Sequence, residues 1–187
     1  MAKKKAASQR VTSKPTAKAK TSMVSTTQPA AERRAADAEL HRLVEKFAPD
    51  HQRLIGALRR SLRKRMPTAC ELVYEYRDCF VISYSPNDHG YEGLFAIRGS
   101  EGGVKFYFNR GKELPDPSKL LKGPGTMARS IDVESASVLG RPEVASLIDA
   151  ALALNTIPFA ETGRGSVVVR STKASSAKAS SKKRKSG

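Results

Sequence analysis

The sequence predicts an α+β domain: an antiparallel sheet of five strands, with two N-terminal helices and one C-terminal helix packed on one face. Three observations lead to this fold class. Apolar residues recur at helical spacing near the start, aromatic and β-branched runs fill the middle, and a second helical pattern closes the domain. Because the strands follow one another instead of alternating with helices, an antiparallel sheet is favoured.

Two helices are expected before the sheet. Four apolar side chains follow the i, i+3, i+4, i+7 rule in a helix over residues 31–47: Leu40, Leu43, Val44 and Phe47. Pro49 interrupts this helix and can open a second one, which should end before Pro67. The last turns of the second helix are rich in cations that complement the negative end of its dipole: Arg59, Arg60, Arg63, Lys64 and Arg65.

The middle of the chain predicts the strands. Runs typical of strands cover residues 70–76, 79–85, 91–98, 103–109 and 127–133. Arg77-Asp78 is a tight connection, so the first two strands should form a hairpin. Pro142 opens the last helix, and a short extra strand over 163–170 is left open.

The fourth strand allows two interpretations. Its sequence Val104-Lys105-Phe106-Tyr107-Phe108 is similar to a strand that stacks on RNA bases. We favour a core strand, because Val104, Phe106 and Phe108 alternate onto one face.

Positive charge gathers at the two ends of the chain. Residues 1–30 contain six Lys and one Arg without an acid, and residues 171–187 contain five Lys and one Arg without an acid. Residues 31–170 hold 21 basic and 18 acidic side chains, so this domain is nearly balanced. With few large apolar residues, both end segments are expected to be disordered basic tails.

Basic tails suggest a polyanionic partner. The residues expected to contact nucleic acid are Lys3, Lys4, Lys5, Lys182, Lys183, Arg184 and Lys185. A tail that only keeps the protein in solution is the other interpretation. No apolar stretch reaches the length of a membrane span and no secretory signal is visible, so we expect a cytoplasmic protein without a membrane partner.

Two carboxylates form a candidate metal or acid–base pair. Glu71 and Glu75 lie on the same face of the first strand. The alternative is that both point to solvent, as strand carboxylates usually do. The three histidines and two cysteines do not have metal-ligand spacing.

The segment before the fifth strand is a candidate anion pocket. Lys122, Gly123 and Gly125 are similar to part of a phosphate-binding loop, but a turn entering the strand is the better interpretation, because no helix follows. Arg129 shares strand parity with Ile131 and should therefore point toward the core side. We expect it either to pair with Glu71 or Glu75, or to face a pocket and hold an anionic ligand.

Several of these pieces together resemble a known bacterial family. Met66-Pro67, the stretch Glu71 to Tyr76 and the stretch Lys122 to Ile131 resemble the YdhG-like domain, a domain of unknown function, over about residues 50–154. Some members are described as frataxin-like, with a helix–sheet–helix fold and a proposed role as iron chaperones. The resemblance therefore implies the α+β fold, and iron as the alternative cofactor.

The sequence thus predicts a non-enzymatic binding or accessory domain, without a resident cofactor, whose tails make weak, sequence-independent contacts with nucleic acid. An intracellular iron-binding chaperone is the alternative. The ligand of the domain and the oligomeric state are left open.

Overall fold

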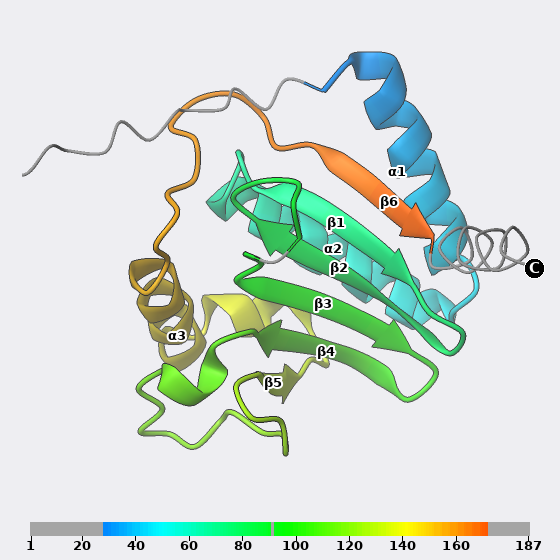
Figure 1. Ribbon diagram of the computed structural model, residues 1–187. Helices are drawn as coiled ribbons and strands as arrows, with labels where there is room; N and C mark the ends of the chain where they lie inside the picture. Colours follow the sequence, from blue (N-terminus) through cyan, green and yellow to red (C-terminus); the bar gives the residue numbers. More distant parts are fainter. Residues whose placement is uncertain (1–27, 91, 172–187) are drawn as a thin grey trace, which may run out of the picture.

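The computed structural model describes residues 28–90 and 92–171 (Figure 1). The tail residues predicted to contact nucleic acid lie outside these ranges. The described chain is an α+β domain with three helices and a mixed sheet of six strands. None of its helices is long and apolar enough to cross a membrane.

Two helices precede the sheet. Helix α1 spans Ala30–Val44 and ends three residues before the predicted limit. Helix α2 spans Pro49–Arg65 and opens at Pro49, as predicted. Proline is favoured at this position because the first turn of a helix does not need its missing N–H.

The sheet is built mainly as an antiparallel meander. Its first five strands are β1 (Cys70–Glu75), β2 (Cys79–Ser85), β3 (Phe95–Ser100), β4 (Gly103–Phe108) and β5 (Arg129–Asp132). Strand β3 begins four residues later than predicted, where Gly93 passes close to Ser83. Two 3-10 turns, η1 (Gly111–Glu113) and η2 (Ala136–Gly140), flank β5, and α3 follows over Pro142–Ala153.

The prediction of five antiparallel strands is wrong in one respect. A sixth strand, β6 (Val167–Ser171), pairs in parallel with β1, so the order across the sheet is β5-β4-β3-β2-β1-β6. The parallel direction follows from the route of the chain, which leaves α3 and returns along the outer side of β1 (Figure 1).

One face of the sheet and the helices form the core. The strand residues in this core share one parity, and α1, α2 and α3 all contribute to it. Leu43, Leu58 and Ile148 are examples from the three helices. In β4, Val104, Phe106 and Phe108 are buried on this face, which confirms the core interpretation of that strand.

Each edge of the sheet is closed by a single pairing. At β6, the side-chain amide of Gln28 donates to the carbonyl of Val167 and accepts from its N–H, both at 2.9 Å. At β5, the backbone of Lys122 exchanges two 2.8 Å hydrogen bonds with Ser130. Such capping limits the open edge on which another strand could pair.

A close approach of two backbones fixes β6 next to β1. A Cβ on Gly165 would lie 1.8 Å from the carbonyl oxygen of Ala69. We therefore expect Gly165→Ala to lower the free energy of unfolding by about 3 kcal/mol, the upper end of the usual cost of overpacking. Denaturant unfolding measures this change.

The matched control is Gly140→Ala, since a Cβ there meets no atom within 4 Å. Equal stability of the two variants would contradict the placement of β6.

Candidate nucleic-acid interface

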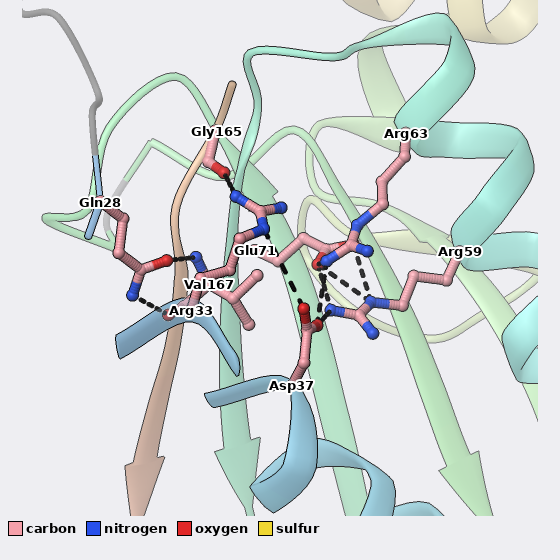
Figure 2. Close-up of polar contacts among 8 residues, drawn as sticks. All are labelled: Gln28, Arg33, Asp37, Arg59, Arg63, Glu71, Gly165 and Val167. Atoms are coloured by element: carbon pink, nitrogen blue, oxygen red, sulfur yellow. Dashed lines mark hydrogen bonds and ion pairs between the residues drawn. The ribbon is translucent and has the colours of Figure 1, made fainter. Parts of the chain in front are cut away.

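A partly buried cluster of ionic side chains joins α1, α2 and β1 (Figure 2). Glu71 of β1 is 1% exposed, although a carboxylate at this position was expected to face solvent under the alternative interpretation. Arg59 Nε lies 3.0 and 2.9 Å from the two carboxylate oxygens of Glu71. Arg63 also donates twice to Glu71, at 3.1 and 2.7 Å.

Asp37 of α1 completes the cluster. It accepts hydrogen bonds from Arg59 and, at 3.2 Å, from Arg63. Burial would raise the pKa of Asp37, but the hydrogen bonds and charges of Arg59 and then Arg63 outweigh burial and hold the pKa below its ordinary value. The same two arginines therefore bind both carboxylates.

Two further side chains border the cluster. Arg33 donates to the carbonyl of Gly165, and its Nε lies 4.0 Å from Asp37. The buried hydroxyl of Tyr84, opposite Glu71 in the strand register, makes no hydrogen bond of regular geometry within the described residues. Burial raises the pKa of this hydroxyl well above its ordinary value, and the charge of Glu71 raises it further.

The geometry does not favour a metal at the predicted carboxylate pair. Glu71 is bound by two arginines, and Glu75 lies 2.7 Å from Lys46 Nζ. Within the part of the chain that the structure describes, no group of three or more His, Cys, Asp or Glu side chains could hold a metal ion. Iron binding at Glu71 and Glu75 stays a prediction, and the residues present do not fit it.

The candidate anion pocket forms one loop ahead of β5. Lys122 pairs with Ser130, and the chain between them turns back through Gly123 and Gly125, so the segment is a turn entering the strand. Lys122 Nζ also lies 3.6 Å from Asp132. These contacts place the predicted residues together without showing what they bind.

The expected pairing of Arg129 with Glu71 or Glu75 is wrong. Arg129 lies on the edge strand β5, four strands away from β1. Its guanidinium instead donates to the carbonyls of Gly125 and, at 2.8 Å, Ala128. Backbone carbonyls of its own loop thus satisfy a guanidinium that is half-buried.

The exposed side of α2 carries a cationic stripe, defined here as Arg53, Arg60 and Lys64. These positions are seven and four residues apart, so they lie on one side of the helix. Arg53 is paired with Asp50. Within residues 28–90 and 92–171, neither Arg60 nor Lys64 has an acidic partner, and both are exposed. The sequence predicts the basic end of this helix, but not which of its cations the fold leaves exposed for a partner.

A groove between α1 and α2 runs beside the cationic stripe. Its volume is about 540 Å³, and its lining includes Arg53, Arg60 and His41. Acidic residues, Asp37 and Glu45, also line it, so the groove itself is of mixed charge. Arg53 and Arg60 of the cationic stripe therefore border this groove, and Lys64 extends the stripe beyond it.

Comparisons with known proteins do not assign this chain to a family. No protein-family model, no curated protein and no solved structure matches this chain. The resemblance to the YdhG-like domain stays a prediction.

The ionic cluster predicts that Glu71→Gln strongly lowers the free energy of unfolding. Removing this charge leaves two largely buried guanidinium groups without their main partner, and breaking a buried pair costs about 3–5 kcal/mol of unfolding free energy. Denaturant unfolding measures the loss. The control, Glu39→Gln, removes an exposed carboxylate paired with Arg42 and should leave the melting temperature nearly unchanged. Similar melting of both variants would contradict the cluster.

The lowered pKa of Asp37 predicts part of the loss of folding stability in acid. Because its pKa is lower in the folded chain than in the unfolded chain, its contribution to stability is present above its ordinary pKa of about 4. The contribution is lost as pH falls through the lower, folded value. Asp37→Asn should therefore lose less stability than the wild type between pH 5 and pH 2, measured by thermal unfolding at each pH. An unchanged pH dependence would refute this role.

Proposed function

We propose that the protein is a non-enzymatic, cytoplasmic accessory protein that binds nucleic acid through phosphate contacts. The distribution of positive charge carries this proposal. Segments 1–27 and 172–187 hold thirteen of the 34 basic residues and none of the 18 acids. Cations that neutralise phosphates release condensed counterions, which supplies sequence-independent affinity.

The folded domain adds one surface to this proposal. Helix α2 contains six basic residues and one acid, whereas the rest of the described chain has 15 basic and 17 acidic residues. The positive excess of the domain is thus confined to α2. Of its six cations, Arg59 and Arg63 are bound by Glu71 and Asp37, and Arg65 lies 2.5 Å from Asp149.

The cationic stripe is therefore the surface of the domain on which phosphates are best placed. Its small neighbours Gly56, Ala57 and Ser61 leave the helix surface accessible around Arg60 and Lys64. We assign the tails the larger share of the binding free energy and the cationic stripe a smaller, fixed share. A rigid helix loses little entropy on binding, so even a few fixed cations contribute.

The test measures binding to a short DNA duplex as a function of salt. The full chain should bind weakly, with Kd on the order of 10⁻⁴–10⁻⁶ M near physiological salt, and lose affinity steeply as salt rises. The fragment 28–171 should lose most of this affinity. It retains Gln28, whose side chain pairs with Val167, so the edge of β6 remains capped.

The double variant Arg60→Gln/Lys64→Gln tests the stripe in the full chain. If each cation contacts one phosphate, the slope of log K against log salt should become shallower by about 2. The matched control is Lys112→Gln/Lys119→Gln, two exposed lysines outside α2. Equal effects of the two pairs would assign the binding to net charge alone, and salt-independent binding would overturn the proposed function.

A further inference from the structure

The sheet has a second face that no helix of the described residues covers, here called the open face. The loop after β2 lies over part of it, since a Cβ on Gly90 would be 2.5 Å from the hydroxyl of Tyr74, and Leu72 is buried beneath this loop. Figure 1 views the sheet from this side, with α2 behind it. The strand register defines a row of side chains that crosses all six strands on this open face. From β6 to β5 the row reads Arg170, Tyr74, Val81, Arg98, Lys105 and Asp132.

Cations dominate this row. Arg98 and Lys105 lie directly opposite each other on β3 and β4, and Arg170 lies at the β6 edge. The row contains one acid, Asp132, whose carboxylate lies 2.7 Å from Lys105 Nζ. The open face is therefore positive near its centre, although the described domain is nearly neutral as a whole.

Two tyrosines, Tyr74 and Tyr107, lie among these cations. The guanidinium carbon of Arg170 lies 5.9 Å from the ring centroid of Tyr74, so a planar cation already stacks there. Arg170 is held in place because it also donates to the carbonyls of Asp88 and His89. Tyr107, half-buried on β4, shares the open face and belongs to the adjacent row, opposite Ala96.

Arg98 lies on β3, between the strands that carry the two tyrosines. Interactions with Cys79 and Tyr107 raise the pKa of its guanidinium, with Cys79 the larger cause. Tyr74 and Tyr107 stand three strands apart, which places them about 15 Å from each other. A strand of two or three nucleotides can span that distance, with its phosphates near the cations between the rings.

We propose that this open face binds single-stranded nucleic acid by stacking bases on Tyr74 and Tyr107 while Arg98, Lys105 and Arg170 contact phosphates. The proposal rests on the proposed function, since it names the substrate class and a second site. Aromatic side chains interleaved with cations on a sheet are the combination that holds unpaired bases without sequence preference. In a duplex the bases are already stacked and cannot reach the sheet.

The experiment uses the full chain and two oligonucleotides with the same number of phosphates: a single-stranded oligothymidine and its abasic counterpart. Binding is measured by titration at several salt concentrations. The chain has five Tyr and no Trp, so quenching of tyrosine fluorescence reports stacking directly. The base-bearing strand should bind at least about fivefold tighter than the abasic strand for each stacked base, and should quench the fluorescence.

The variants Tyr74→Leu and Tyr107→Leu should bring the affinity for oligothymidine down toward that of the abasic strand, without changing abasic binding. Arg77→Gln is the matched control, because Arg77 is an exposed cation in the β1–β2 turn. Circular dichroism verifies that each variant remains folded.

Three outcomes are distinguishable. Equal binding of both strands by the wild type overturns the open-face site and leaves the proposed function intact. If neither strand binds, or if their binding does not depend on salt, the proposed function itself is overturned. A change of oligomeric state in the tyrosine variants, measured by light scattering, with unchanged DNA binding would identify the open face as a contact between copies and overturn the proposal.

Discussion

The buried carboxylate of Glu71 constrains much of this structure. An ionised carboxylate cannot be taken out of water unless charged hydrogen-bond donors replace the lost hydration. Arg59 and Arg63, one helical turn apart on α2, supply those donors. Asp37 of α1 shares the same two arginines, so one set of ionic contacts sets how both helices lie on β1 (Figure 2).

The rotation of α2 about its own axis decides which cations are left for a partner. Arg60 and Lys64 each follow a Glu71-bound arginine by one residue, which places them about 100° further around the helix. Since Arg59 and Arg63 must face Glu71, Arg60 and Lys64 must face solvent. The same feature that stabilises the domain thus orients the cationic stripe.

The two faces of the sheet have different chemistry for a topological reason. All three helices and both 3-10 turns contribute to or border the core on one side of the sheet. In β4, buried and half-buried residues alternate strictly. The other face carries charged and phenolic side chains together with aliphatic ones, of which Leu72 is buried. With both edges capped, by Gln28 at β6 and Lys122 at β5, this open face is the broad surface on which the sheet can meet a partner.

The sequence by itself determined the local elements and the distribution of charge. Helical and strand periodicity, with breakers such as Pro49 and Pro142, are local properties, so α2, α3, the β1–β2 hairpin and the core face of β4 were predictable. Only the tertiary structure decided the long-range contacts. The alternation of β1 shows that Glu71 and Glu75 share a face, but the helices that cover this face decide that it is buried. Likewise the path of the chain pairs β6 with β1 and places Arg129 on β5, four strands away from Glu71. Local patterns cannot encode such contacts, since they depend on how distant segments pack.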